Sequence, residues 1–391
     1  MHSLFREAML PDSTNQLSWG APPWTIDFRP EPRALPAEVD FAVVGGGFTG
    51  LAAAAWLRRV APEKTVALLE MGEIGAGSSG RTGGLALAET AAGDLPGLGD
   101  VLDGFSQTLR ELGVDCDLTL PGAWELARPH PLPGPRPGQP RDWAISWNDS
   151  GDLRVVNEVP GGTIDPGKMV SGLARAAEHR GALICEHSRV EKISFGEPLR
   201  LAVAGRELRA RGVLFASNAQ SLELSGLAGS TEPKFILAAA TKPLTTSQLA
   251  ELGLASGKPF YTVELPYLWG RLLPSGGIIF GGAGWTELKD WRELDRMDVG
   301  AKQQVETFAR FERRVRGMHP ALRTVEFTHR WGGPILVGEG WRPVFRHHPS
   351  SPRALVLGAY SGHGVALSVY LARWAAEVLL GRRELPAWES A

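Results

Sequence analysis

The chain has 391 residues, of which 43% are hydrophobic and 21% are charged, as is typical of a soluble globular protein with two or three domains. Its net charge of −2 provides no electrostatic argument for binding nucleic acid or anionic lipid. Its two cysteines, Cys116 and Cys185, lie outside any CxxC pattern, which argues against a disulfide framework or a zinc site and indicates a reducing cytoplasm.

Residues 1–38 are predicted to form an amino-terminal arm. Arg6, Glu7 and Asp12 interrupt its apolar residues, so it is a poor signal peptide. No apolar run along the chain approaches the roughly 18 residues of a membrane helix. Prolines between positions 22 and 36 predict an extended arm lying on the body or a flexible leader, and Trp19 and Trp24 favour packing.

A strand, a glycine turn and a helix are predicted in direct succession over residues 39–57. The valine-rich run is typical of a parallel strand covered on both faces, and the alanines that follow favour a helix. The glycines match G-x-G-x-x-G as Gly45, Gly47 and Gly50. In this pattern the first glycine allows the tight turn, the second lets backbone N–H groups approach a pyrophosphate, and the third lets the helix pack on the strand. A glycine-rich turn without a ligand is the alternative.

The next expected strand ends at Glu70, 20 residues beyond Gly50. This spacing is expected of the carboxylate that binds a ribose 2′-hydroxyl, and an acid there disfavours the 2′-phosphate of NADP. A solvated acid at a strand end is the alternative. In the glycine-rich stretch 75–84, backbone N–H groups can form a nest for anionic groups, and Arg81 can add a charge near a pyrophosphate. The alternative is a flexible surface loop.

Together, the glycine motif, Glu70 and the sequence Gly-Ser-Ser-Gly-Arg-Thr-Gly-Gly at 77–84 resemble FAD-dependent oxidases of the D-amino-acid oxidase, glycine oxidase and sarcosine oxidase type. Within this family the chain is most similar to the γ-glutamylputrescine oxidase-like branch, whose loop commonly has asparagine in place of Thr82. The resemblance spans about residues 39–383 and is loose over 91–160. It implies an α/β fold in which a Rossmann-like FAD-binding domain is joined to an α+β substrate domain with an antiparallel sheet.

Between residues 91 and 219 the patterns predict further core elements. Helices are expected at 101–112 and from Pro166 to residue 179, and strands at 118–126, 183–186, 189–193 and 211–219. The resemblance implies that the backbone at Val190 contacts the adenine and that Ala216 lies beside the cofactor phosphates. The alternative for Val190 is an ordinary strand residue, and the alternative for Ala216 is an ordinary strand end.

Strand-like pieces between residues 235 and 282 resemble the substrate-domain sheet of these oxidases, whose inner face covers the flavin. The pieces hold Tyr261, Tyr267, Trp269 and Arg271. Aromatic residues on such a face either contact substrate or belong to the core. An amphipathic helix over 299–315 is predicted to lie on the solvent side.

The carboxy-terminal part is expected to return to the cofactor. Residues 330–333 match the Arg-Trp-Gly-Gly element of the family, and the turn at 358–364 resembles its Gly-x-x-x-Gly-His-Gly element beside the flavin pyrimidine. A helix N-terminus there stabilises the negative charge of reduced flavin by up to about 2 kcal/mol. His363 either adds to this effect or only packs the turn. We interpret Arg346-His347-His348 as a polar turn and expect no metal site.

The resemblance and the motifs together define the expected site. Arg271 and Arg330 are candidates to hold a substrate carboxylate, with a structural ion pair as the alternative for each. Because neither cysteine lies in the late cofactor-binding region, FAD is expected to bind without a covalent bond. The candidate catalytic residues are His363, Arg271, Arg330, Tyr261 and Trp331. The expected FAD-binding residues are Gly45, Gly47, Phe48, Thr49, Gly50, Glu70, Met71, Gly77, Ser78, Ser79, Arg81, Thr82, Gly83, Gly84, Val190, Ala216, Gly333, Gly358, Ser361, Gly362, His363, Gly364 and Val365.

The predicted FAD-binding domain is discontinuous. It comprises residues 39–90, 160–230 and 325–391, and the substrate domain comprises 91–159 and 231–324, after the arm at 1–38.

The hypothesis for function is oxidation of a C–N bond in an amine or amino acid. The neutral amine loses a hydride to flavin N5, the imine hydrolyses, and oxygen reoxidises the flavin. A dehydrogenase that uses an electron carrier and a flavin-binding module without turnover are the alternatives. A dehydrogenase that binds only NAD is disfavoured, because the second glycine turn and the 75–84 loop have no role there. The expected partners are a small-molecule substrate and oxygen or a carrier, with no nucleic acid and no membrane span, in the cytoplasm.

Overall fold

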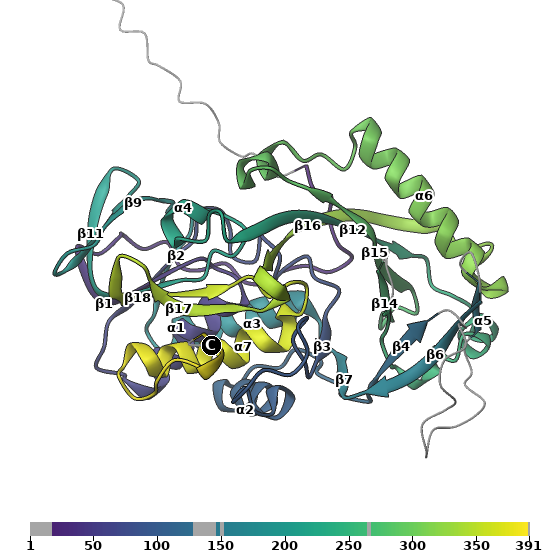
Figure 1. Cartoon of the computed structure of the whole chain (residues 1–391), viewed down its shortest axis with the longest axis horizontal. Coiled ribbons are helices and arrows are strands. Elements are labelled where there is room, and N and C mark those ends of the chain that lie inside the picture. The colour runs from purple at the N-terminus through teal and green to yellow at the C-terminus, as the bar shows by residue number, and fades with distance from the viewer. Residues whose placement is uncertain (1–17, 128–145, 149–151, 264–266, 390–391) are drawn as a thin grey trace, which may run out of the picture.

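The computed structural model describes residues 18–127, 146–148, 152–263 and 267–389. Within these ranges the strands form two sheets of eight strands each and one two-stranded ribbon, made of β3 (Leu85–Leu87) and β7 (Gly161–Thr163). The two sheets make up the two halves of the molecule, with the first sheet on the left in Figure 1 and the second on the right. The α/β fold expected from the sequence is confirmed.

The first sheet is parallel from β18 to β8, and β17 adds an antiparallel strand at one edge. Its central strands are apolar on both faces, as in Phe41-Ala42-Val43-Val44, because helices or loops cover both sides. Its path runs β17-β18-β11-β1-β2-β8, and β10 and β9 extend from β11 as an antiparallel hairpin. The strands are β1 (Glu38–Val44), β2 (Val66–Leu69), β8 (Leu183–Cys185), β9 (Val190–Ser194), β10 (Leu199–Val203), β11 (Arg206–Phe215), β17 (Val344–His348) and β18 (Ser351–Gly358).

Four long helices pack together on one side of this sheet (Figure 1). Alanines 52–55 of α1 are fully buried, and their small side chains let α1 pack against both α3 and α7. A further helix, α2, packs against α7: a Cβ added at Gly104 would lie 2.4 Å from the ring of Tyr370. The expected domain division places residues 101–112 with the substrate domain, whereas their apolar face meets the helices of the first sheet. The four helices are α1 (Phe48–Val60), α2 (Val101–Leu112), α3 (Pro166–His179) and α7 (Gly364–Leu379).

The second sheet has the order β16-β12-β15-β14-β13-β4-β6-β5. Its described pairs are antiparallel apart from β13 and β4, which run parallel. The edge strand β16 contains residues expected in the FAD-binding domain, but it pairs along its length with β12 and reaches the first half of the molecule at its far end (Figure 1). The strands are β4 (Ala123–Ala127), β5 (Ser146–Asn148), β6 (Asp152–Val159), β12 (Thr231–Thr241), β13 (Phe260–Thr262), β14 (Leu268–Leu272), β15 (Ile278–Glu287) and β16 (Phe327–Gly338).

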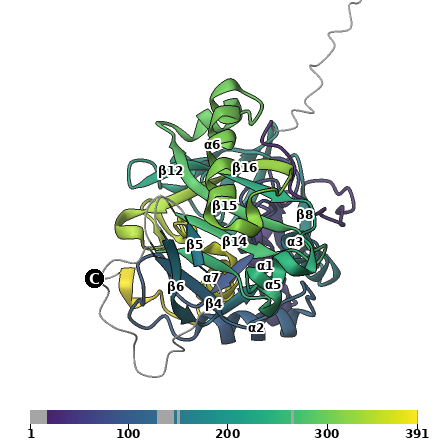
Figure 2. The same cartoon turned by 90° about the vertical axis from the view of Figure 1, so that its right-hand side faces the viewer.

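An amphipathic helix, α6 (Lys302–Met318), covers the outer side of the second sheet, as Figures 1 and 2 show. It buries Phe308, Phe311 and Val315 and exposes most of its charged side chains, although Glu312 is buried. The helix expected at 299–315 is therefore confirmed, three residues further along the chain. The short helices are α4 (Leu222–Ser225), α5 (Thr246–Glu251), η1 (Leu254–Ser256), η2 (Trp291–Arg296), η3 (Pro320–Leu322), η4 (Glu339–Trp341) and η5 (Ala387–Glu389).

Two local predictions are wrong. Residues 346–348 belong to strand β17 and do not form a polar turn, because His348 is buried and stacks on Phe195 with 4.3 Å between ring centroids. The strand expected from residue 118 begins only at Ala123, although Thr119 forms an isolated bridge with Thr163. No group of three or more His, Cys, Asp or Glu side chains is placed to hold a metal ion within the described residues.

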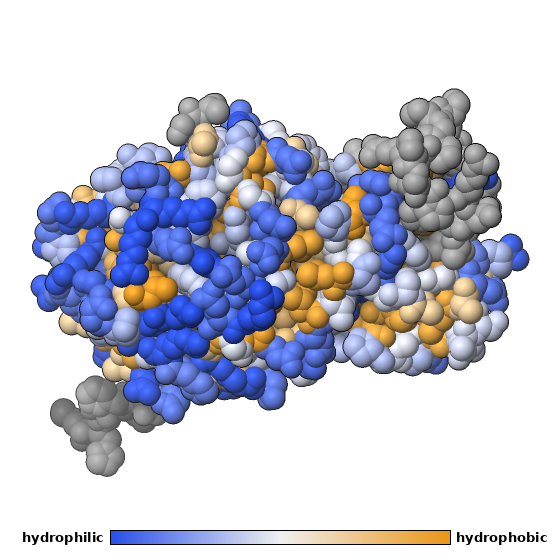
Figure 3. Space-filling model, turned by 90° about the horizontal axis from the view of Figure 1, so that it is seen from below, coloured by the Kyte–Doolittle hydropathy of each residue, from blue (hydrophilic) through white to orange (hydrophobic). Residues whose placement is uncertain are grey.

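Among the helices formed by the described residues, none is long and apolar enough to span a membrane. On the face seen from below, hydrophilic residues cover most of the left half, and hydrophobic residues gather in smaller patches near the middle and right (Figure 3).

The described part of the arm packs on the body. Trp19 is fully buried, donates a hydrogen bond from Nε1 to the carbonyl of Leu294 at 3.0 Å, and meets the ring of Phe235 edge-on. The carbonyl of Trp19 also accepts a bond of 2.7 Å from the backbone N–H of Gly332 in β16. The arm is therefore anchored to the second sheet.

We expect Trp19→Ala to lower the free energy of unfolding by about 3–5 kcal/mol, because it leaves a cavity in a packed region and removes a buried hydrogen bond. Urea unfolding followed by circular dichroism measures this loss. The control is Trp341→Ala at a side chain that is 36% exposed, for which we expect a loss below about 1 kcal/mol. A loss of unfolding free energy in Trp19→Ala as small as that in the control would show that the arm contributes little to stability.

Candidate functional site

A cavity of about 1940 Å³ lies between the two sheets. The turn after β1, the loop at 75–84 and the start of α7 line it on the side of the first sheet, and the second sheet closes it with aromatic side chains. Its volume exceeds the roughly 300–1,000 Å³ of a typical small-ligand pocket. It therefore has room for a dinucleotide and a second small molecule.

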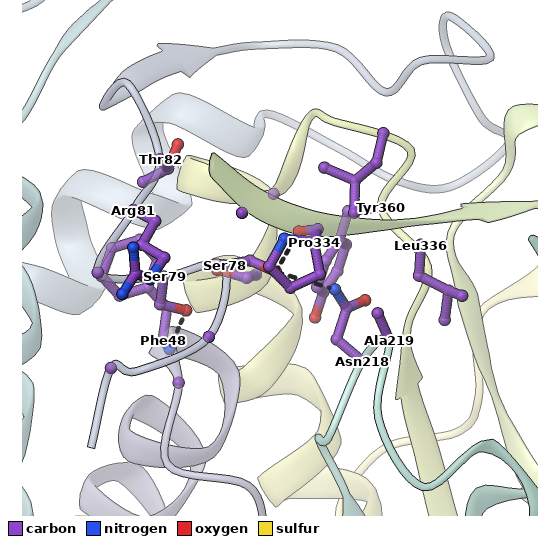
Figure 4. Close-up of a pocket in the computed structure, with 18 of the residues that line it drawn as sticks. Phe48, Ser78, Ser79, Arg81, Thr82, Asn218, Ala219, Pro334, Leu336 and Tyr360 are labelled. Carbon is purple, nitrogen blue, oxygen red and sulfur yellow. Dashed lines mark hydrogen bonds between the residues drawn. The ribbon is translucent and has the colours of Figure 1, made fainter. Parts of the chain in front are cut away.

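The turn between β1 and α1 brings backbone N–H groups to this cavity. Gly45 has φ of +113°, and a Cβ there would lie 2.6 Å from the carbonyl oxygen of Ala216. A Cβ at Gly50 would lie 1.9 Å from the carbonyl oxygen of Gly45, so only glycine lets the helix start this close to the strand. Gly47 lines the cavity, and the N–H of Phe48 donates to Ser79 Oγ at 2.9 Å (Figure 4).

Glu70 follows β2 and lines the same cavity. Its carboxylate accepts hydrogen bonds from the N–H groups of Gly46 at 2.7 Å and Gly72 at 2.8 Å. Burial raises the pKa of this carboxyl group, while the two N–H donors act in the opposite direction. Because a carboxylate can accept about four hydrogen bonds, Glu70 keeps the capacity to accept from a ligand hydroxyl.

Hydrogen bonds through Ser78 join the 75–84 loop to both halves of the molecule. Figure 4 shows Asn218 Nδ2 donating to Ser78 Oγ at 3.4 Å, and Ser78 Oγ donating to the carbonyl of Pro334 in β16 at 2.7 Å. Asn218 Oδ1 accepts from the N–H of Ala359 at 3.0 Å. Beside them Ser217 lines the cavity, and its Oγ is buried without a hydrogen-bond partner among the described residues. This orphaned hydroxyl and the glycine turns fit a polar dinucleotide.

Arg81 holds the arm, the loop and β16 together. It donates to the carbonyls of Gly20 at 2.6 Å, Ala76 at 3.1 Å and Gly332 at 3.4 Å. Burial lowers the pKa of this guanidinium to about 10. Arg81 borders the cavity, but its hydrogen bonds to backbone carbonyls give it a structural role in addition to any contact with a phosphate.

The N-terminus of α7 forms another part of the wall. Gly362 has φ of +92°, and no atom lies within 4 Å of a Cβ built there, so the turn is open to the cavity. Tyr360 shares a 2.8 Å hydrogen bond with Thr49 at the start of α1, which joins the two glycine turns. Burial lowers the pKa of His363, which keeps the imidazole neutral. The positive end of the α7 dipole therefore faces the cavity without a charged side chain.

Tryptophan rings close the cavity on the side of the second sheet. A Cβ at Gly83 would lie 2.1 Å from the ring of Trp269, and one at Gly281 would lie 1.9 Å from it, so this indole fits between the loop and β15. Trp331 donates from Nε1 to the carbonyl of Arg81 at 2.9 Å and meets Trp24 of the arm edge-on at 5.6 Å. The loop and the second sheet are therefore in direct contact.

Tyr261 lies between two carboxylates. Its hydroxyl is 3.0 Å from Glu125 Oε1 and 3.3 Å from Glu89 Oε1. Burial and the two carboxylates raise the pKa of Tyr261 well above its usual value. Burial, with help from Glu125, also raises the pKa of Glu89. Tyr261 and Glu89 both line the cavity.

The two candidate arginines lie outside the cavity wall. Arg271 is 4% exposed and donates from Nε to the carbonyl of Gly83, behind the loop. Arg330 faces α6 and forms a 2.6 Å ion pair with Glu312. The alternative of an ion pair describes Arg330, whereas Arg271 has a structural contact of another kind, a hydrogen bond to a backbone carbonyl.

The structure brings most of the other expected residues to one cavity. Gly50, Gly84 and Gly358 do not line it: Gly50 and Gly84 make close backbone contacts behind the wall, and Gly358 packs beside Asn218. The expected residues that line it are Gly45, Gly47, Phe48, Thr49, Glu70, Met71, Gly77, Ser78, Ser79, Arg81, Thr82, Gly83, Val190, Ala216, Tyr261, Trp331, Gly333, Ser361, Gly362, His363, Gly364 and Val365.

The wall also contains residues that the sequence patterns did not indicate. Trp24, Glu89, Trp285 and Trp341 come from the arm, a loop and two separate parts of the second half, and none belongs to a local motif. Tyr360 lies inside the second glycine turn, residues 358–364. Its position in that turn is the sequence signal that could have identified it as a lining residue.

Comparisons of the sequence and of the structure with known proteins both find oxidoreductases that are similar to this chain. The sequence is 26% identical over 385 residues to the gamma-glutamylputrescine oxidoreductase of Escherichia coli, covering 88% of this chain and 84% of the relative. It is 27% identical over 402 residues to the probable oxidoreductase OrdL of Rhizobium meliloti, covering 92% and 87%. Glycine oxidase from Geobacillus kaustophilus superposes with a TM-score of 0.69 at 19% identity, covering 90% of this chain and 97% of that one.

The family result covers most of the chain. The L-amino acid deaminase of Proteus vulgaris has the same fold, with a TM-score of 0.67 at 15% identity, covering 91% of this chain and 96% of that one. The sequence profile of the DAO family, described as "FAD dependent oxidoreductase", matches residues 40–378. The predicted resemblance and the FAD cofactor are confirmed, and the chain therefore belongs to the DAO family of FAD-dependent oxidoreductases.

Proposed function

We propose that the protein oxidises a C–N bond of an amine or amino acid to an imine, which then hydrolyses. The observation that carries this proposal is the single cavity that joins a dinucleotide cradle on one sheet to an aromatic and acidic wall on the other. Similarity to proteins named gamma-glutamylputrescine oxidoreductase and glycine oxidase supports an amine or amino-acid substrate. When bound, FAD would supply the redox chemistry, as the acceptor of the hydride removed from the carbon beside the amine nitrogen and as the donor of electrons to oxygen.

The chain's own residues position the cofactor in this proposal. Glu70 would accept a hydrogen bond from a ribose hydroxyl. The N–H groups near Gly47, together with Ser217, would lie toward the pyrophosphate. The α7 N-terminus beside Gly362 and His363 stabilises negative charge on the ring system. Neither Cys116 nor Cys185 lines the cavity, which supports binding without a covalent bond. Both thiols are free and buried, in keeping with the proposed cytoplasmic location.

The wall opposite the glycine turns excludes water and orients the substrate. Trp269 and Trp331 pack closely against the 75–84 loop and leave no path between loop and sheet at their contacts. The raised pKa of Tyr261 keeps its hydroxyl protonated at neutral pH, so it acts as a hydrogen-bond donor and not as a base. We therefore propose that the reacting amine has already lost its ammonium proton when it is oxidised.

This proposal predicts a rise of kcat/KM with pH. A primary alkylamine has a pKa near that of lysine, about 10.4, so the neutral form should increase about tenfold per pH unit between roughly pH 7 and 9. Steady-state rates over this range, with the stability of the holoenzyme checked at each pH, test the rise. A flat profile would mean that the substrate reacts as its ammonium form or that another step limits the rate.

The central prediction is that an amine or amino acid bleaches the flavin absorbance of the purified protein. Each member of a panel is added without oxygen, and the spectrum is recorded. Recovery of the absorbance on admitting oxygen identifies an oxidase, whereas recovery only with an added carrier identifies a dehydrogenase. A bound flavin that no member of a broad panel reduces would contradict the proposed function.

We expect Glu70→Gln to weaken FAD binding about tenfold to a hundredfold, because it removes a buried charge that accepts hydrogen bonds. Titration of the apoprotein with FAD, followed by flavin fluorescence, gives the Kd. Glu63→Gln, at an exposed position in the turn before β2, is the matched control. An unchanged Kd for Glu70→Gln would exclude a role for this carboxylate in FAD binding.

A further inference from the structure

The charged side chains differ between the two parts of the cavity wall. Among the described lining residues, Arg29 and Arg189 lie near the carboxylates of Glu70 and Glu73. Arg29 pairs with Glu73, and Arg189 follows Ser188, whose N–H donates to the carbonyl of Glu70 at 2.7 Å. These groups belong to the dinucleotide end. Under the second sheet, Glu89 lines the cavity beside Tyr261, and Glu125 lies on the other side of the Tyr261 hydroxyl.

Under the second sheet, the Tyr261 hydroxyl lies within hydrogen-bond distance of two carboxylates. Tyr261 has a single O–H proton, so it donates to either Glu125 or Glu89 at one time. Glu125 is further held by Asn157, whose Nδ2 donates to Oε2 at 2.9 Å. Glu89 lines the cavity, and no basic side chain of the described residues forms an ion pair with it. Its carboxylate is therefore the acceptor with spare capacity.

An aromatic cluster of Tyr267, Trp285 and Trp341 lines the same cavity. The three ring centroids are 6.3–6.5 Å apart, and Tyr267 and Trp341 are partly exposed. Lys234, which pairs with Glu232 and Glu287, already places its ammonium group 4.6 Å from the centre of the Trp285 ring, so Tyr267 and Trp341 provide the rings that remain for a ligand. Aromatic faces attract cations, so this cluster favours a positively charged ligand independently of the carboxylates.

We propose that the substrate is an amine that carries a second, cationic amino group, and that Glu89 is the specificity-determining residue that receives this second charge. This inference rests on the proposed function, since it places the reacting amine toward the cofactor cradle. The Tyr261 hydroxyl lies 3.3 Å from Glu89 and closer, at 3.0 Å, to Glu125, so Glu89 keeps the capacity to accept from a ligand, and the aromatic cluster lines the same cavity. Diamines and polyamines are the corresponding chemical class.

The same arrangement disfavours a substrate with a carboxylate at that end. Recognition of a carboxylate usually uses an arginine fork, and both candidate arginines are already bonded outside the cavity wall, Arg271 to a carbonyl and Arg330 to Glu312. A carboxylate placed beside Glu89 and Glu125 would meet two like charges. Burial and the neighbouring Glu125 carboxylate already raise the pKa of Glu89, and an incoming cation would offset the repulsion between the two carboxylates.

The test compares three primary amines of equal chain length: 1,4-diaminobutane, butylamine and 4-aminobutanoate. For the wild-type holoenzyme we expect the highest kcat/KM with the diamine and the lowest with the amino acid. Glu89→Gln should reduce the preference for diaminobutane over butylamine about tenfold to a hundredfold, because the charge is lost while the side chain keeps its size. Glu326→Gln, which removes an exposed carboxylate paired with Lys242 outside the cavity, should leave the preference unchanged.

A binding measurement keeps the inference separate from the proposed function. Butane-1,4-bis(trimethylammonium) has no neutral amine to oxidise, so calorimetric titration into the holoenzyme reports recognition of charge alone. Tighter binding of this dication than of butyltrimethylammonium, lost in Glu89→Gln, would support the inference even if no amine reduces the flavin. Oxidation of all three amines with no effect of Glu89→Gln, in a variant with normal FAD content, would overturn the inference and leave the proposed function intact.

Discussion

The contact between the 75–84 loop and strand β16 determines the geometry of the site. Trp331 donates to the carbonyl of Arg81, Ser78 donates to the carbonyl of Pro334, and Arg81 binds the carbonyl of Gly332. These bonds join a loop that follows the first sheet to an edge strand of the second. Since the cavity lies between the sheets, its width depends on this junction, and the arm reinforces it through Gly20.

Small residues and buried polar groups have complementary roles around the cofactor cradle. Glycines at 45 and 50 allow backbone contacts that no other residue permits, which brings the N–H groups of the turn to the cavity. Glu70 then fixes the turn by accepting from Gly46. The cradle is therefore largely preorganised, because hydrogen bonds within the protein already hold the loops that would contact the dinucleotide.

The charged side chains around the cavity differ between the cofactor part and the substrate part. Arg29 and Arg189 line it near Glu70 and Glu73, whereas Glu89 lines it beside Tyr261 of the second sheet, without a lysine or arginine ion pair among the described residues. The first arrangement suits a polyanionic cofactor and the second suits a cationic amine. Family membership alone does not distinguish amine from amino-acid substrates, so the wall of the second sheet is where the specificity of this protein is decided.

The cofactor cradle and its FAD family could be predicted from the sequence alone, because short contiguous motifs such as Gly45 to Gly50 encode a strand, a turn and a helix within one local unit. The helices at 101–112 and 166–179 and the strands on either side were also predictable, since their periodic apolar residues report burial directly. The substrate wall was predictable only in part: Tyr261 and Trp331 were candidates and line the cavity, whereas Trp24, Glu89 and Trp341 are far apart in the chain and reach the cavity only through sheet pairing and loop packing. Arg271 and Arg330 show the same limit: the sequence identified their chemistry, but only the tertiary structure decided that each is bonded behind the wall, to Gly83 and to Glu312.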